Sequence, residues 1–376
     1  MSKKRILFLV PSLRRAGAEN QAVQLVNGLS DADFDKHLLS YLPEKDLVDV
    51  IDANSVAYHF VPRQRKVDTS VAATIGEIID KNQIDIIHCT LENALLYGFL
   101  GRRYAARQPR LICAIHTTKQ ATIKHELADW LLYRHLLKKC VQVWFMCRMQ
   151  ADLWIRRMPF LCDRAKVVYN GIQISDFNPA SDPEAGSRFR GQLGIATDAK
   201  VICCVAGLRP EKNHLVLLRS FKRFVDSGNM GSHLLLAGTG EMESRLTKLV
   251  EQLGLDASVT FLGGMDDVRP VLAASDCKVL ASKAETFSMA MLEAMAMQVP
   301  VICTKVGGAG EAIDDRKNGV LVTPGAVDEL AAAMEWLLSD DDRRAAAGQA
   351  ARKIVEEKFT YAKMIENSHD CLLHLT

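Results

Sequence analysis

The sequence lacks several features that would assign it at once to a class of protein. No run of about 18 apolar residues occurs, so no transmembrane helix is predicted. The ten cysteines form no C-x-x-C pair, which argues against zinc or a redox dithiol and favours reduced thiols. The apolar stretch after the basic start, residues 6–10, is too short for a signal peptide and is read as a strand. These absences predict a cytoplasmic protein.

The composition is that of a soluble globular protein, with 48% hydrophobic and 24% charged residues. Its 376 residues are enough for two domains of ordinary size. The net charge of +2 conceals an asymmetry, because residues 1–175 carry +8 and residues 176–376 carry −6. A basic half indicates an anionic partner: a membrane surface, a phospholipid-linked substrate or nucleic acid. A basic face that is merely solvated is the alternative.

Short apolar runs alternate with amphipathic helical patterns along the whole chain. In the first half the helical patterns cover residues 17–29, 69–81, 91–107 and 124–139. Continuous apolar strands between helices are typical of parallel sheets covered on both faces. The sequence therefore predicts an α/β fold of two Rossmann-like doubly wound domains with a ligand cleft, joined near residues 167–187. The basic helix at 124–139 is read as packing on the core, with a membrane-surface helix as the alternative.

Two glutamates eight positions apart are the most informative feature. Glu285 is expected in the loop before a helix that begins near Ser288, and Glu293 in the second turn of that helix. A helix start offers unpaired N–H groups and a positive dipole end, which suit a phosphate. Two carboxylates that flank an anion site indicate a nucleotide-sugar pocket.

Two cations follow the first strand of the second half. Arg209 and Lys212 fall in a loop that opens a helix, where a guanidinium and an ammonium can hold a diphosphate. Solvated surface charges are the alternative reading. Two glycine-containing turns are further candidates: Gly17 before the first helix, and residues 307–311. Each would let the backbone approach a phosphate or a sugar, and each can also be read as an ordinary turn.

Two histidines and a set of closely spaced aspartates are further candidate site residues. His116 ends an apolar strand, which favours a place at the site, and His88 is left open between a site residue and a structural one. The D-x-D patterns at Asp31, Asp33 and Asp35 fall in a turn and are read as solvated. We expect no metal ion.

With these motifs the chain resembles the retaining glycosyltransferases of family 4, which have the GT-B architecture. The resemblance covers essentially the whole length and rests on residues 16–19, 168–172, 209–213 and, most specifically, 284–311. It implies an acceptor-binding domain at 1–170, a donor-binding domain at 171–359, and a C-terminal helix around 360–376 that packs back on the first domain.

The resemblance also implies roles for individual residues. Glu285 would contact the hydroxyls of the donor sugar and Glu293 the ribose. Arg209 and Lys212 would hold the diphosphate, Gly17 would lie near it, and His116 would lie beside the reacting sugar. The catalytic set is thus His116, Glu285, Lys212 and Arg209. The donor-binding set is Gly17, Arg209, Lys212, Glu285, Thr286, Phe287, Ser288, Met289 and Glu293.

The sequence departs from the family pattern at three positions. The usual arginine five residues before the lysine is replaced by Gly207, with Arg209 two places later. Thr286 stands where glycine is usual, next to the donor sugar, and is expected to influence the choice of donor. Gln298 also replaces a usual glycine and is expected to affect only a turn.

The function implied is a retaining, metal-independent hexosyltransferase. It would use a UDP- or GDP-linked sugar as co-substrate, with no cofactor, and a glycan or lipid-linked acceptor in polysaccharide or lipopolysaccharide synthesis. An anionic membrane is a further expected partner, at the inner face of the cytoplasmic membrane, and nucleic acid is not. The alternatives are a nucleotide-sugar epimerase of the same fold and a non-catalytic scaffold.

Overall fold

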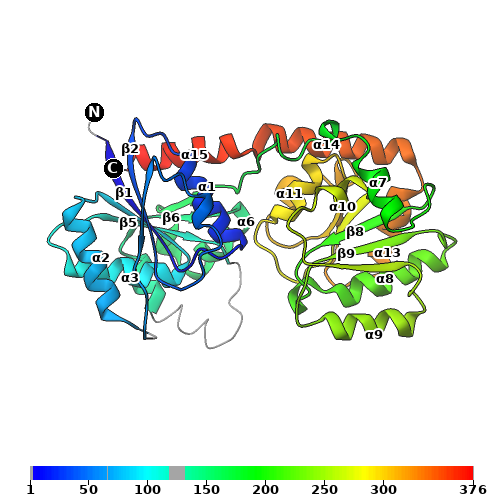
Figure 1. Ribbon diagram of the computed structural model, residues 1–376, viewed down its shortest axis with the longest axis horizontal. Helices are drawn as coiled ribbons and strands as arrows, with labels where there is room; N and C mark the ends of the chain where they lie inside the picture. The colour runs from blue at the N-terminus through cyan, green and yellow to red at the C-terminus, as the bar shows by residue number, and fades with distance from the viewer. Residues whose placement is uncertain (1–2, 66, 118–131, 376) are drawn as a thin grey trace. The chain divides into compact units, whose positions relative to one another are not determined.

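The computed structural model describes residues 3–65, 67–117 and 132–375. The chain divides into two compact units, Met1–Gly171 together with Ala362–Thr376, and Ile172–Tyr361. Each unit contains one sheet with helices on both faces (Figure 1). The predicted α/β fold of two Rossmann-like domains is confirmed.

The first unit is built on a seven-stranded parallel sheet of order β3-β2-β1-β4-β5-β6-β7. Its strands are β1 Lys4–Val10, β2 Phe34–Ser40, β3 Val56–Phe60, β4 Ile86–Thr90, β5 Arg110–Ile115, β6 Cys140–Phe145 and β7 Ala165–Val167. The central strands are buried throughout, as expected for apolar runs covered on two faces.

Helices cover this sheet, with α2 and α3 on one side and α1 and α15 on the other (Figure 1). They are α1 Gly17–Gly28, α2 Thr69–Lys81, α3 Glu92–Tyr104, α5 Arg134–Leu137, α6 Arg148–Arg157 and α15 Tyr361–Leu373. Lys4 Nζ donates to the carbonyls of Leu372 and Leu373 at 3.0 and 2.6 Å, and so fixes the end of α15 to β1. Residues 124–131 of the predicted basic helix lie outside the described residues.

The second unit repeats the plan with six parallel strands in the order β10-β9-β8-β11-β12-β13. The strands are β8 Val201–Val205, β9 His233–Ala237, β10 Val259–Gly263, β11 Cys277–Leu280, β12 Val301–Thr304 and β13 Gly319–Val322. The helices are α7 Ala185–Gln192, α8 His214–Asp226, α9 Glu243–Leu253, α10 Arg269–Ala273, α11 Met289–Ala296, α12 Ala309–Ala312, α13 Val327–Leu338 and α14 Asp341–Lys358. Helices α8, α9 and α13 share one face, and α10 and α11 lie on the other (Figure 1).

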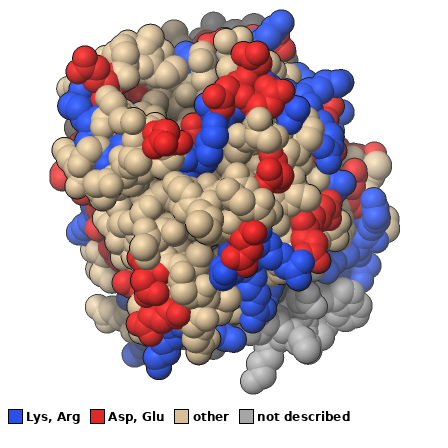
Figure 2. All heavy atoms as spheres, turned by 90° about the vertical axis from the view of Figure 1, so that its right-hand side faces the viewer, with Lys and Arg blue, Asp and Glu red and all other residues tan. Residues whose placement is uncertain are grey.

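The surface and the cysteines agree with an ordinary globular protein. All ten cysteines are free, and eight of them are buried. On the face shown in Figure 2, basic and acidic side chains are interspersed with uncharged ones. Within the described ranges, no helix is long and apolar enough to cross a membrane.

Candidate functional site

The candidate site lies in the second unit, where the strand order reverses. Strand β8 pairs with β9 on one side and with β11 on the other. In open parallel sheets, ligands bind outside the carboxyl ends of the two strands at such a reversal. The loop after β8 carries Arg209 and Lys212, and the loop after β11 carries Glu285. Residues far apart in sequence are therefore placed at one edge of the sheet.

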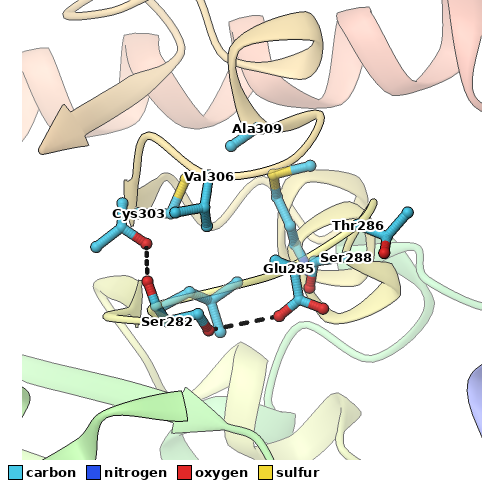
Figure 3. A pocket seen from close by; sticks show the side chains of 10 residues that line it. Ser282, Glu285, Thr286, Ser288, Cys303, Val306 and Ala309 are labelled. Atoms are coloured by element: carbon cyan, nitrogen blue, oxygen red, sulfur yellow. Dashed lines mark hydrogen bonds between the residues drawn. The ribbon is translucent and has the colours of Figure 1, made fainter. Parts of the chain in front are cut away.

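Lys212 and Glu285 form an ion pair across these two loops. Lys212 Nζ lies 2.5 Å from Oε2 of Glu285, and each side chain is 23% exposed. Ser282 Oγ donates to the same carboxylate oxygen at 3.4 Å (Figure 3). Figure 3 shows the Glu285 carboxylate turned toward Ser282, with the side chain of Thr286 directed away from it. The pair thus presents a positive and a negative group at the carboxyl ends of two adjacent strands.

The loop that holds Arg209 and Lys212 rests on a glycine turn at 238–240, which the sequence analysis did not single out. The N–H of Leu208 donates to the carbonyl of Thr239 at 2.9 Å. A Cβ at Gly240 would overlap the carbonyl oxygen of Leu208, so only glycine allows this approach. The G-x-G pattern in the sequence was the signal that could have identified this support.

Arg209 itself is exposed and lines a hollow of about 110 Å³ together with Arg245 and Lys283. Two buried residues, Asn213 and His214, line the same hollow. Nδ2 of Asn213 and Nδ1 of His214 have no hydrogen-bond partner among the described residues. Burial lowers the pKa of His214 to about 4, so its ring is neutral at pH 7. The hollow therefore combines three cations with buried polar nitrogens. Sequence reasoning found only Arg209 of this set.

The turn at 307–311 supports the Glu285 loop. Gly307 has φ +55°, and a Cβ there would overlap the carbonyl oxygens of Glu285 and Thr286. The N–H of Gly308 donates to the carbonyl of Thr286 at 2.7 Å. Thr304 Oγ1 donates to the carbonyl of Ser282 at 2.6 Å. The glycine turn thus fixes the backbone of Glu285 and Thr286, and Thr304 fixes that of Ser282 ahead of them.

Helix α11 begins one residue after Ser288, which is its N-cap. Ser288 Oγ accepts from the N–H of Met291 at 3.3 Å. Phe287 is 5% exposed and packs on Phe359 with ring centroids 5.1 Å apart, so it anchors the loop. Met289 is half-buried in the first turn.

Glu293 lies in the second turn of α11 and is half-buried. Burial raises the pKa of its carboxyl, and the positive charge of Lys278 opposes that shift. Among the described residues, no hydrogen bond or ion pair closer than 4 Å joins its carboxylate to another side chain. The carboxylate oxygens are therefore available as hydrogen-bond acceptors.

The first unit holds the two remaining site candidates. Gly17 is the first residue of α1, and a Cβ there would meet no atom within 4 Å, so packing does not require glycine. His116 follows β5 and lies on a cavity of about 30 Å³ that His88 also lines. Burial lowers the pKa of His116 to about 4 and that of His88 to about 3. His88 is the third residue of β4 and not at its end.

Both halves of the chain match sequence models of glycosyltransferases. Residues 15–176 match the sequence model of "Glycosyltransferase Family 4", and residues 187–354 match that of "Glycosyl transferases group 1". The N-acetyl-alpha-D-glucosaminyl L-malate synthase of Bacillus anthracis is 32% identical over 303 residues, which are 79% of this chain and 77% of that protein.

Two other relatives match over about half of their own length. An uncharacterised glycosyltransferase of Methanocaldococcus jannaschii is 34% identical over 53% of this chain and 51% of that protein. The lipopolysaccharide core biosynthesis glycosyltransferase LpsE of Rhizobium meliloti is 30% identical over 46% and 49%, respectively.

The fold agrees with these sequence matches. The crystal structure of HepE from Anabaena superposes with a TM-score of 0.86 at 22% identity, covering 98% of this chain and 99% of that one. The identity over most of the Bacillus anthracis relative, together with the two sequence models, shows the family. The chain therefore belongs to glycosyltransferase family 4 and has the GT-B fold.

Proposed function

We propose that the protein is a retaining glycosyltransferase that moves a sugar from a UDP- or GDP-linked donor to an acceptor hydroxyl. The observation that carries the proposal is the Lys212–Glu285 pair at the strand reversal of the second unit. The pair places a cation that can bind a diphosphate next to a carboxylate that can accept hydrogen bonds from sugar hydroxyls. The similar HepE was crystallised in complex with UDP and with UDP-glucose, which supports a nucleotide-sugar donor.

The proposed reaction needs no carboxylate nucleophile. The bond between the sugar anomeric carbon and the diphosphate oxygen breaks while a bond to the acceptor oxygen forms on the same face. The proton of the acceptor hydroxyl passes to the departing diphosphate. Lys212, Arg209 and the start of α11 after Ser288 stabilise the negative charge that develops there, without a metal ion. His116, neutral at pH 7, and Gly17 are proposed as further contacts of the donor from the first unit.

For the acceptor we propose a lipid-linked or polysaccharide glycan at the inner face of the cytoplasmic membrane. The net charge of +8 in residues 1–175 favours an anionic acceptor or membrane surface. The role of the Rhizobium meliloti relative in lipopolysaccharide core synthesis agrees with that choice. The Bacillus anthracis relative is an N-acetyl-alpha-D-glucosaminyl L-malate synthase, so a small carboxylic acid is the second candidate acceptor.

The test is a transfer assay with UDP- and GDP-sugars in the presence and absence of membrane glycolipid extract or L-malate. The proposal predicts an acceptor-dependent product whose anomeric configuration, read by NMR, equals that of the donor. An inverted product would refute retention. Conversion of the donor sugar to its epimer without acceptor would favour the epimerase. Failure to bind or consume any nucleotide sugar would favour the scaffold.

A further inference from the structure

Lys278 is a fully buried lysine in the centre of the second sheet. Its relative exposure is 0%, and it lies on β11 with Cys203 of β8 and Val301 of β12 as its neighbours across the sheet. An ammonium group loses several kcal/mol of solvation when it is buried, so such a position is rarely filled by lysine. The surrounding strand residues are apolar and do not compensate it. A lysine at this position therefore needs a specific explanation.

The ammonium group of Lys278 is directed at helix α11. Its Nζ donates to the carbonyl of Ala290 at 2.5 Å, in the first turn of that helix. Ala290 and Glu293 are three positions apart, and residues at that spacing share one face of a helix. The face that receives the lysine is thus the face that carries Glu293. The same ammonium group opposes the effect of burial on the Glu293 carboxyl.

Burial lowers the pKa of Lys278, and among the described residues that act on its ammonium group only Glu293 supplies a carboxylate that opposes this shift. Those residues are Glu293 from α11, the thiols of Cys203 and Cys204 from β8, and Lys212 from the loop after β8. Burial raises the pKa of both thiols, that of Cys204 to about 12, so they are neutral at pH 7. Lys212 is itself a cation. At the C-terminal end of α11, Arg352 donates to the carbonyl of Ala296 and pairs with Glu356.

We propose that Lys278 is a positioning residue of the donor site, which fixes the first turn of α11 and keeps Glu293 ionised beneath a bound ribose. The inference rests on the proposed function, because it takes Glu293 as the ribose-binding carboxylate. A ribose that covers Glu293 removes water from its carboxylate, and this loss of solvation favours the protonated form. The positive charge of Lys278 opposes that effect. An ionised carboxylate accepts stronger hydrogen bonds from ribose hydroxyls than a neutral carboxyl does.

The experiment is calorimetric titration of UDP and GDP into the full-length protein between pH 5.5 and pH 8.5. Lys278→Met replaces the ammonium with a side chain of similar length, and Lys248→Met removes an exposed lysine on α9 as the matched control. Without Lys278, the pKa of Glu293 rises further. We expect Lys278→Met to bind the nucleotide about tenfold more weakly than wild type at pH 6 and to approach wild-type affinity at pH 8.5. The Lys248→Met protein should follow the wild-type profile.

A second variant separates charge from structure. In the double variant Lys278→Met/Glu293→Gln, no ionisable group remains in the pair, so the pH dependence added by Lys278→Met should disappear. A loss of affinity that is equal at every pH, or a profile identical to wild type, would overturn the role of Lys278 and leave the proposed function standing. If wild type bound neither UDP nor GDP, both the proposed donor site and the role of Lys278 would be refuted.

Discussion

The ammonium nitrogen of Lys212 lies 2.5 Å from Oε2 of Glu285, although the two residues belong to loops that follow different strands. The pair holds both side chains at the carboxyl ends of β8 and β11 before a donor binds. A bound diphosphate would interact with the ammonium group of Lys212 alongside Glu285. The Glu285 carboxylate could then still accept hydrogen bonds from sugar hydroxyls. Under the proposed function, the ion pair is thus a prearranged part of the donor site.

Separate removal of the two charges should abolish most of the activity. We expect Lys212→Ala and Glu285→Gln each to lower kcat/KM for transfer by about 100-fold or more, because in the proposed mechanism each variant loses a group that contacts the diphosphate or the donor sugar. The matched control is Arg223→Ala, which breaks an exposed ion pair with Asp328 in the same unit. Near wild-type transfer by either variant would show that the site has been assigned wrongly.

Gly307→Ala should displace the Glu285 loop. The new Cβ overlaps two carbonyl oxygens at a φ of +55°, so we expect a loss of about 2 kcal/mol in unfolding free energy and weaker nucleotide binding. Gly325→Ala is the control, because it has φ +85° but no atom within 4 Å of the new Cβ. Equal effects of the two variants on nucleotide affinity would contradict a support role for Gly307.

Gln298→Gly should stabilise the protein. Gln298 has φ +59° after α11, and the N–H groups of Gln298 and Val299 donate to the carbonyls of Met295 and Ala294, which is a Schellman motif. A side chain costs about 1–2 kcal/mol there, and the greater freedom of unfolded glycine offsets about half of this gain. Chemical denaturation should show a gain of about 0.5–1 kcal/mol. Gly254→Gln, at φ +63°, should show the opposite sign.

The buried histidines should make the protein sensitive to acid. Burial lowers the pKa of His88 to about 3, below the ordinary value near 6.5 that applies in the unfolded chain. The unfolded state therefore takes up the proton first, and stability is lost as the pH falls from about 6.5 toward 3. His88→Phe, between Phe8 and Trp144, should reduce this loss when denaturation is measured at pH 7 and pH 5. An unchanged loss would show that His88 contributes nothing to it.

Much of this architecture could be predicted from sequence because its signals are local. Apolar runs such as 201–205 mark buried parallel strands, and the loops that follow them carry Lys212 and Glu285. Other features depend on contacts across the fold. Lys278 lies inside a strand of otherwise apolar character, and nothing local shows that its ammonium group meets α11. The support of Gly307 for Glu285 likewise depends on the approach of two backbones.

Gln298 shows a different limit of sequence reasoning. Its replacement of a usual glycine was expected to affect only a turn, and the residue does lie in a turn. The left-handed φ shows that this turn is adopted at a cost in backbone energy. A usual glycine is the sequence signal for such an angle, but only the structure shows that Gln298 keeps it.

The proposed function requires the second unit to bind a nucleotide sugar through Lys212, Glu285 and Glu293. Thermal unfolding in the presence of a panel of UDP- and GDP-sugars tests it most directly, because a ligand that binds only the folded state raises the Tm. We expect at least one donor to raise the Tm of wild type and none to raise that of Lys212→Ala/Glu285→Gln. A panel without effect on wild type, or an equal rise in both proteins, would contradict it.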